Sequence, residues 1–434
     1  MKFHGVNSLL VLALLSMPAH THAVEQTKGS FSDKFRQLEE ELPTPNIYRN
    51  AAGQPAQAYW QQKASYQIAI RLDEENRSAS GSETISYRNN SPDTLKYLWL
   101  QLDQNRFHRN SMDSLTKTME DPLKLTYQEL RYQQFIDDFD GGFKISRVRG
   151  SDGKPLPHTI VGTLMRIDLP QPLAPGKGVR FSIDWQYKLV DSKSANSRRD
   201  GYEYFPADGN NIFLMAQWYP RMVAYSDYEG WHNKEFVGRG EFTLEFGDFD
   251  VRITVPADHI VSSTGELQNP AEVLTREQRQ RLKEARNAEK PVFIVTPAEA
   301  LANEAERDSN TRTWRFAAKN VRDFAFASSR KFIWDAQGFR QDDANRPFVM
   351  AMSFYPKEGE PLWSKYSTQA VIHTMEVYSR YSFAYPYPVA QSVNGPAGGM
   401  EYPMITFNGP RTELQEDGSR TYTRSEKRFL IGVV

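Results

Sequence analysis

Residues 66–72 read Tyr-Gln-Ile-Ala-Ile-Arg-Leu, with an apolar or aromatic side chain at every second position. Such alternation is typical of a β-strand that buries one face and exposes the other. Similar strand-like runs occur at 83–87, 95–102, 164–169, 179–187, 241–246, 250–255, 292–295 and 313–317. Turn-forming segments such as Pro175-Gly176 separate some of them. The first part of the chain is therefore predicted to be mostly antiparallel sheet, arranged as a sandwich or a saddle.

Composition excludes several classes of protein. The 434 residues include 53 Lys+Arg and 54 Asp+Glu, so the chain lacks the basic surplus of a typical nucleic-acid binder. The mean hydropathy of -0.64 is too low for a protein with many membrane spans. Cysteine is absent, which removes disulfide frameworks, cysteine-based zinc modules and thiol catalysis.

The N-terminus has the pattern of a secretory signal. Lys2 is followed by the apolar run 9–15, and Thr21-His22-Ala23 offers small residues for cleavage. We expect a signal peptide at 1–23, a secreted or periplasmic protein, and no membrane span in the mature chain; the alternative is an uncleaved anchor. A polar leader at 24–58 follows, with a short helix expected at 31–42.

Three further regions are predicted to be helical. A charged segment near 270–290, which includes 275–286, is interpreted as a solvated helical insertion, with a partner-binding helix as the alternative. After a strand at 348–354, apolar and aromatic residues at helical spacing predict a helix over about 361–381. A last helix starts near Ser425 and runs into the apolar Phe429–Val434. We expect Phe429, Leu430 and Ile431 to be uncovered, as in a catalytic domain that is cut short.

Common catalytic signatures are absent from the sequence. There is no G-x-S-x-G, no phosphate-binding G-x-x-x-x-G-K-[ST] and no H-E-x-x-H. His373 and Glu376 lie three residues apart on an expected helix, and two ligands do not make a zinc site, so we interpret them as a surface pair or a helix-packing pair. The prediction is that this chain contains no metal ligands and no catalytic residue of its own.

The most specific segment is Gly398-Gly399-Met400-Glu401-Tyr402-Pro403. Two glycines allow a backbone to approach another group closely, and Glu401 then projects from a short strand. A carboxylate in that position suits an ammonium group, because charge-assisted hydrogen bonds are strong. Taken alone, the segment is better interpreted as an edge-strand turn with an exposed glutamate.

The Gly-x-Met-Glu segment resembles the exopeptidase motif of zinc aminopeptidases related to membrane alanyl aminopeptidase (aminopeptidase N), in the gluzincin group. The resemblance runs in order from about Tyr66 to the end of the chain. It includes 217–221 (QWYPR), 230–231 (GW), 246–251 (FGDFDV), 263–267 (STGEL) and 323–326 (DFAF). It implies that Glu401 grips the free α-amino group of a peptide and that Gly398, Gly399 and Met400 contact the peptide backbone. The family motif usually ends in Asn where this chain has Tyr402.

The resemblance also implies a domain order and a cofactor. A saddle-like β domain at 59–335, with its insertion near 270–290, would precede the beginning of an α+β thermolysin-like catalytic domain at 336–434. The intact family uses zinc with an H-E-x-x-H helix, which supplies the general base and lies shortly after the Gly-x-Met-Glu motif. This chain lacks that helix, so we expect the N-terminal fragment of an aminopeptidase. The alternatives are a non-catalytic β-rich module that binds peptides or proteins, or carbohydrate binding by aromatic side chains, which are 12% of the residues.

Overall fold

The computed structural model describes residues 45–116, 124–195, 197, 199–238, 240, 242–396 and 398–434. The chain forms two compact units. The described part of the small unit is 45–59 with 227–230, and the large unit begins at Trp60 and holds the rest. The predicted signal peptide at 1–23 and the helix expected at 31–42 lie outside the described residues.

One ion pair ties the small unit together. Arg49 donates from Nε to Asp227 Oδ2 at 2.8 Å and from Nη2 to Oδ1 at 2.9 Å. The Asp227 side chain is only 1% exposed, so this two-point contact is shielded from water. The hydrogen bond to Asp227 raises the pKa of Arg49. Residues 45–58, the described part of the predicted polar leader, contain turns and no helix.

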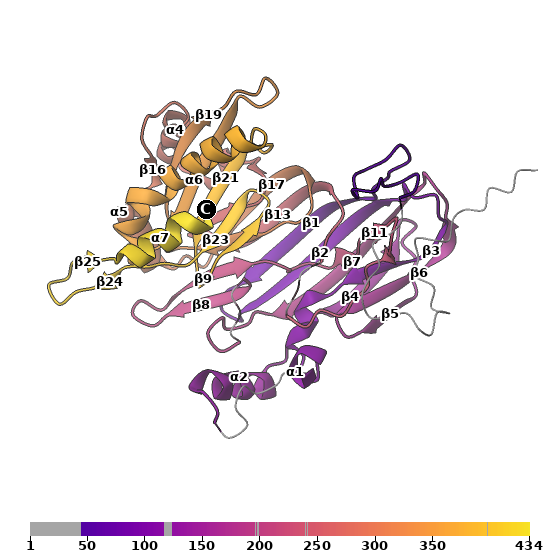
Figure 1. The fold of residues 1–434 in the computed structure, drawn as a ribbon. Helices are drawn as coiled ribbons and strands as arrows, with labels where there is room; N and C mark the ends of the chain where they lie inside the picture. Colours follow the sequence, from indigo (N-terminus) through magenta and orange to yellow (C-terminus); the bar gives the residue numbers. More distant parts are fainter. Residues whose placement is uncertain are drawn as a thin grey trace, which may run out of the picture. The chain divides into compact units, whose positions relative to one another are not determined.

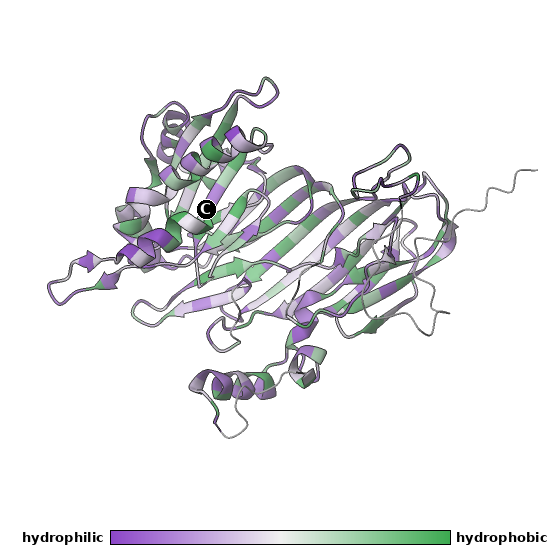
Figure 2. Cartoon of the chain, in the orientation of Figure 1, coloured by the Kyte–Doolittle hydropathy of each residue, from purple (hydrophilic) through white to green (hydrophobic). Residues whose placement is uncertain are grey.

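A seven-stranded sheet dominates the large unit (Figure 1). Its strand order is β15-β17-β13-β1-β2-β7-β4, and all neighbours are antiparallel except β1 and β13. Its members are β1 (Lys63–Asp73), β2 (Ser78–Arg88), β4 (Lys144–Gly150), β7 (Gly178–Lys188), β13 (Gly247–Pro256), β15 (Glu266–Leu267) and β17 (Thr311–Val321). Burial alternates along β1, as the sequence predicts, and Figure 2 shows the same alternation in hydropathy along these strands.

Two four-stranded sheets also belong to this unit. The first has the order β10-β3-β6-β5, with β3 (Leu95–Gln101), β5 (His158–Val161), β6 (Leu164–Leu173) and β10 (Arg221–Met222). The second has the order β14-β18-β9-β8, with β8 (Gly201–Phe205), β9 (Asn210–Met215), β14 (Ile260–Ser263) and β18 (Phe326–Ser329). Two short strands are β11 (Tyr225–Ser226) and β12 (Gly230–Trp231). The predicted mostly β first part is confirmed.

The strand expected at 241–246 is wrong. Residues 242–246 form only isolated bridges, Val223 with Leu244 and Lys63 with Phe246, and the strand β13 begins at Gly247. At that residue the backbone comes so close to β1 that an added Cβ would lie 1.5 Å from the Ala64 carbonyl oxygen. The pairing of β13 with β17 also shifts register there, so the regular ladder starts only after the glycine.

Most helices of the first part are short. They are α1 (Met112–Thr116), α2 (Tyr127–Asp138), α3 (Pro270–Val273), α4 (Arg276–Ala285) and α5 (Pro297–Glu306), with the 3-10 turn η2 (Asp103–Phe107). The helix predicted at 275–286 is α4. Thr275 caps it by accepting from the Gln278 backbone N–H, and the Gln278 side chain accepts in return from the Thr275 N–H. Within the described residues, no helix has the length and apolar character that a membrane crossing requires.

A mixed six-stranded sheet follows, in the order β16-β19-β20-β21-β23-β22. Its strands are β16 (Val292–Val295), β19 (Ile333–Arg340), β20 (Phe348–Tyr355), β21 (Val389–Asn394), β22 (Met400–Tyr402) and β23 (Ile405–Asn408). The remaining elements are η3 (Lys357–Gly359), α6 (Leu362–Tyr381), α7 (Arg424–Val433) and the hairpin β24 (Glu413–Leu414) with β25 (Arg420–Thr421). The predicted change from a mostly β part to an α+β part is confirmed. The predicted domain boundary at 335/336 stays a prediction. Two strands of this sheet do not respect it, since β16 lies before the boundary and β19 crosses it.

Packing of the last two helices differs in part from expectation. Val371 and Met375 on α6 are buried, whereas Tyr378 and Tyr381 are 67% and 81% exposed. On α7, Leu430 is fully buried in the main core, and its carbonyl oxygen accepts from Asn408 Nδ2 at 2.9 Å. The expectation that Leu430 is uncovered is therefore wrong, because α7 packs on β23. Phe429 and Ile431 remain more than one-third exposed.

One buried carboxyl predicts a pH dependence of stability. Asp335 on β19 is 2% exposed and accepts hydrogen bonds from Thr368 Oγ1 and from Tyr355 Oη at 2.7 Å. Burial raises the pKa of Asp335 from 3.8 to about 7, against these hydrogen bonds, which lower it. Because the folded pKa exceeds the unfolded one, this group stabilises the fold fully below about pH 4, and that contribution is lost as pH rises through about 7.

We expect the free energy of unfolding to fall with pH between 5 and 8, with about 2–4 kcal/mol of that fall due to Asp335. Asp335→Asn cannot ionise, so its unfolding free energy should depend less on pH in urea titrations at each pH. The quantity compared is the slope of the unfolding free energy against pH, because the substitution also changes the absolute stability. Asp417→Asn, at an exposed turn, is the matched control and should keep the wild-type slope between pH 5 and 8. Equal slopes for Asp335→Asn and the wild type would contradict the expectation.

Candidate functional site

The predicted motif lies at the edge of the six-stranded sheet. β22 pairs only with β23 among the described strands, with Met400 opposite Phe407, Glu401 opposite Thr406 and Tyr402 opposite Ile405. An edge strand presents backbone N–H and C=O groups along its outer side, and an extended peptide can pair with them. The motif therefore occupies a position at which a peptide can add to the sheet.

Gly399 sets the entry into this strand. Its φ of +113° is one that side-chain-bearing residues rarely adopt. A Cβ there would lie 3.1 and 3.2 Å from the two Val433 methyl groups at the end of α7 and 3.8 Å from Glu401 Oε1. The backbone at Gly399 therefore lies close to the end of α7 and to the Glu401 carboxylate, and the expected contact of the glycines with a peptide stays a prediction. Gly398 is exposed just before it.

Gly399→Ala is expected to destabilise the protein by about 2–3 kcal/mol, from backbone strain together with crowding against Val433. Gly418→Ala is the control, because Gly418 also has a positive φ (82°) but nothing within 4 Å of the added Cβ. The control should lose only the strain contribution, about 1 kcal/mol. Urea denaturation of both variants measures the difference, and equal losses would show that the contact with Val433 is unimportant.

The Glu401 side chain is exposed and forms no hydrogen bond or ion pair with the other described residues. Directly opposite residues of an antiparallel pair share a face, so Glu401 projects from the same face as Thr406. Met400 and Tyr402, on either side of it, are half-buried against the main core. The strand is therefore anchored by its neighbours and leaves one carboxylate open to a cationic ligand.

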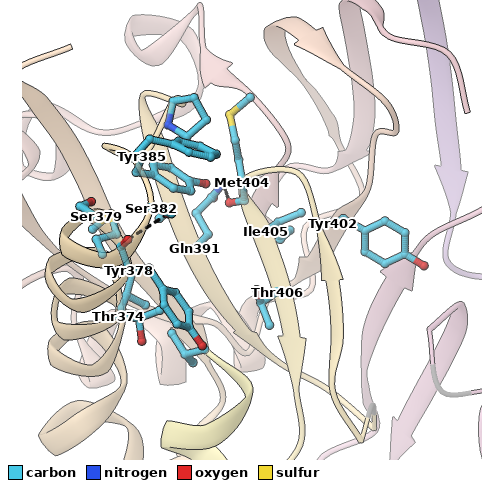
Figure 3. Close-up of a pocket in the computed structure, with 16 residues that line it drawn as sticks. Thr374, Tyr378, Ser379, Ser382, Tyr385, Gln391, Tyr402, Met404, Ile405 and Thr406 are labelled. Atoms are coloured by element: carbon cyan, nitrogen blue, oxygen red, sulfur yellow. Dashed lines mark hydrogen bonds between the residues drawn. The ribbon is translucent and has the colours of Figure 1, made fainter. Parts of the chain in front are cut away.

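The Tyr402 side chain extends away from the other labelled residues in Figure 3. Arg221, in the segment 217–221, lies within electrostatic range of the Tyr402 hydroxyl group. Burial lowers the pKa of Arg221, but the carboxylates of Asp103 and Asp323 outweigh it, and the net pKa is raised. The guanidinium donates to Asp103 Oδ2 at 2.8 and 3.0 Å and to Asp323 Oδ2 at 2.7 Å.

The sequence-based analysis missed the geometry of Gln217. Gln217 has a left-handed φ of +54° and is 6% exposed. Its backbone carbonyl oxygen accepts a hydrogen bond from Gln104 Nε2 at 3.2 Å. The neighbouring Trp218 donates from Nε1 to the Phe324 carbonyl oxygen at 2.9 Å. No signal in the sequence marks a positive φ at a glutamine, although the aromatic and proline residues after it indicate a fixed turn.

The connection from β22 to β23 is fixed by hydrogen bonds to the β-rich part of the same unit. Thr264 Oγ1 donates to the Pro403 carbonyl oxygen at 2.9 Å. Gln391 Nε2 donates to the carbonyl oxygens of Ser263 at 2.7 Å and Met404 at 3.2 Å. These contacts hold the edge strand in one position relative to the sheets that precede it in the chain.

A pocket of about 370 Å³ lies beside β21, β23 and α6 (Figure 3). Its walls are mostly apolar and aromatic and include Met375, Tyr378, Phe383, Ile405 and Val434. Thr406, which lies opposite Glu401, also lines it. The Glu401 carboxylate therefore projects from the sheet face that carries this apolar pocket.

The residues present do not fit a zinc site. Outside the first 23 residues the sequence has five histidines, His108, His158, His232, His259 and His373. Among the described residues, no three His, Cys, Asp or Glu side chains are grouped so as to hold a metal ion. His373 Nδ1 lies 3.9 Å from Glu376 Oε2 and both side chains are more than half exposed, so the predicted surface pair is confirmed.

No protein-family model and no curated protein matches the chain. Solved structures similar to it include M1 zinc metallopeptidases. One, from Deinococcus radiodurans, has 12% identity and a TM-score of 0.48, covering 87% of this chain and 65% of that one. The same enzyme bound to a Tyr-Ser-Ala substrate gives 12% identity, a TM-score of 0.46 and the same coverage. A two-domain M1 zinc metallopeptidase bound to L-tryptophan has 13% identity and a TM-score of 0.45, and the match covers 81% of this chain and 61% of that one. This chain thus spans less than two-thirds of their length.

Proposed function

We propose that this chain is the N-terminal part of a secreted or periplasmic zinc aminopeptidase, in which Glu401 binds the free α-ammonium group of a peptide. The observation that carries the proposal is the Glu401 carboxylate, exposed and without a partner among the described residues, on an edge strand whose backbone can pair with a peptide. The ordered sequence motifs from about Tyr66 onward support it. Gly398, Gly399 and Met400 would contact the peptide backbone, as the sequence resemblance implies.

Zinc enters this proposal as a cofactor whose ligands lie outside the 434 residues. The described side chains offer no such ligand set, so no chemical step is assigned to them. What these residues do is bind and orient: Glu401 takes the cationic end of the peptide, and β22 takes its backbone. A carboxylate that requires a free ammonium group makes the enzyme remove residues from the N-terminus and not cut within the chain.

The experiment compares two proteins, the 434-residue chain and the product of the gene read onward past Val434. We expect the 434-residue chain, after chelation and reloading, to hold well under one equivalent of zinc and not to hydrolyse aminoacyl anilides. We expect the longer product to contain H-E-x-x-H, to bind zinc stoichiometrically and to hydrolyse free but not N-acetylated substrates. Tight stoichiometric zinc in the 434-residue chain would contradict the first expectation.

A gene without H-E-x-x-H beyond Val434 would overturn the aminopeptidase proposal and favour the non-catalytic peptide- or protein-binding module. That alternative predicts binding without hydrolysis, measurable by titrating the chain with peptides that carry a free or an acetylated N-terminus. N-terminal sequencing of protein from a periplasmic or culture fraction tests the proposed cleavage after Ala23 separately from the enzymatic proposal.

A further inference from the structure

The outward face of the seven-stranded sheet carries many small hydroxyl-bearing and basic side chains and fewer acidic ones. On β2, Ser80, Ser82, Thr84 and Ser86 alternate with core residues and point away from the core. The aromatic side chains of the same sheet, such as Tyr66, Tyr87 and Trp185, are buried on the other face. Aromatic carbohydrate binding on this sheet is therefore not supported, because the outward positions of the described central strands carry no ring.

Arginines flank the hydroxyl-bearing strand on both sides. The register places Arg71, Arg252 and Arg315 on β1, β13 and β17, and Arg180, Arg147 and Arg149 on β7 and β4. One cross-strand row runs Arg147, Asp184, Ser82, Ala69, Arg252 and Arg315. Basic side chains outnumber acidic ones on this face, although the whole chain has a net charge of -1.

Part of this positive charge is not neutralised within the chain. Arg315 pairs with Asp250 at 2.6 Å, Arg147 pairs with Asp184, and Arg180 donates to Gln67 Oε1 at 2.8 Å. In contrast, the side chains of Arg71, Arg149 and Arg252 are exposed and make no hydrogen bond or ion pair with the described residues, although the charge of Arg71 contributes to the lowered pKa of Asp73. These three guanidinium groups, on three different strands, are available to an anionic ligand.

We propose that this sheet face binds an acidic polysaccharide. Neighbouring strands lie about 4.8 Å apart and outward residues on one strand repeat about every 6.8 Å, so the arginines stand around a hydroxyl-rich surface several sugar units long. Guanidinium groups bind carboxylate and sulfate in a two-point manner, and serine and threonine hydroxyls both donate to and accept from sugar hydroxyls. The positive charge and the row of hydroxyl groups together fit an extended anionic sugar chain.

Other polyanions fit this face less well. A single-stranded nucleic acid is held by stacking on aromatic side chains, and the outward positions of the described strands have none. Reading the sequence of duplex DNA requires a helix or a two-stranded ribbon that enters a groove, and these strands lie within a seven-stranded sheet. A membrane surface is bound by apolar side chains that insert below the headgroups, which the face also lacks. These three ligands are outcomes of the test.

The experiment measures binding of the 434-residue chain to immobilised polygalacturonate, which carries carboxylates, and to dextran sulfate, with neutral dextran, duplex DNA and anionic vesicles in parallel. We expect binding to both acidic polysaccharides that weakens as salt rises, and none to neutral dextran. The triple variant Arg71→Ser, Arg149→Ser and Arg252→Ser should bind about 10-fold more weakly. The control variant Arg276→Ser, Lys283→Ser and Lys290→Ser removes the same charge from exposed positions in and after α4.

The control variant should keep wild-type affinity, since its positions lie off the sheet. Equal losses in the two variants would show a response to net charge alone and overturn the proposal. Absence of binding to both acidic polymers at low salt, or binding to DNA or vesicles at least as tight, would overturn it as well. Thermal melts check that the variants fold, and the single variant Arg252→Ser replaces the triple one if the triple variant is destabilised. Activity on peptides plays no part, so this test is independent of the aminopeptidase proposal.

Discussion

Arg221→Met is expected to lower the free energy of unfolding by about 3–5 kcal/mol, because it leaves two buried carboxylates without their cation. The Arg221 side chain is 6% exposed, and those of Asp103 and Asp323 are 1% and 11% exposed. Burial already raises the pKa of Asp103 against the lowering effect of Arg221. Without Arg221 the carboxyl of Asp103 should be protonated more readily, so the deficit of the variant should shrink as pH falls toward about 4.

Arg315→Met is the matched control for this variant. It also breaks an arginine–aspartate pair, but Arg315 and Asp250 stand on the outward sheet face with side chains 46% and 35% exposed. Its stability should stay close to that of the wild type, because solvent already screens an exposed pair. Guanidinium or urea titrations at pH 7 and pH 4.5 measure both variants. Similar losses at the two arginines would show that burial of the Arg221 cluster contributes little.

The strands of the mostly β first part of the chain could be predicted because each buries one face and exposes the other to solvent. Alternation of the kind seen in Tyr66–Leu72 requires no knowledge of the partner strand. The partner itself could not be predicted, and β1 pairs in parallel with β13 nearly two hundred residues later. The loss of strand structure at 242–246 could not be predicted either, because it depends on how closely the backbone of Gly247 approaches Ala64.

The helices were predictable in position but less so in packing. Val371, Met375, Tyr378 and Tyr381 share a helical spacing, yet only the first two are buried, because the end of α6 extends beyond the described elements that cover its start. Leu430 was expected to be uncovered and is buried, because β23 lies beneath α7. Burial of a side chain depends on the neighbouring element, which a local pattern does not contain.

The candidate site was predictable as a segment but not as a surface. Its glycines and glutamate are contiguous in sequence, so their chemistry can be recognised without a structure. The structure adds the positive φ of Gly399 and the pairing of Glu401 with Thr406. It also adds the hydrogen bond from Thr264 to the Pro403 carbonyl oxygen, which joins residues that are far apart in the sequence.

Glu401→Ala is expected to lower kcat/KM for substrates with a free α-amino group by about 10- to 1,000-fold in the zinc-containing gene product. Glu401 has no partner among the described residues, so its removal leaves nothing unpaired in the free enzyme. The loss arises only with substrate bound, when the ammonium group is covered and lacks a counter-charge. Stability should therefore stay near wild type while kcat/KM falls, and Glu401→Gln should lie between the two because it keeps a hydrogen-bond acceptor.

Glu413→Ala provides the control, since Glu413 is an exposed glutamate on the nearby hairpin strand β24. It should leave kcat/KM unchanged. N-acetylated substrates lack the ammonium group, so they should be poor substrates of the parent and almost indifferent to Glu401→Ala. A mutation that merely disturbed the sheet edge would instead reduce hydrolysis of free and acetylated substrates by the same factor. Either that equal loss or full activity of Glu401→Ala on free-amine substrates would show that Glu401 is only an exposed turn residue. The main support for the proposed function would then be gone.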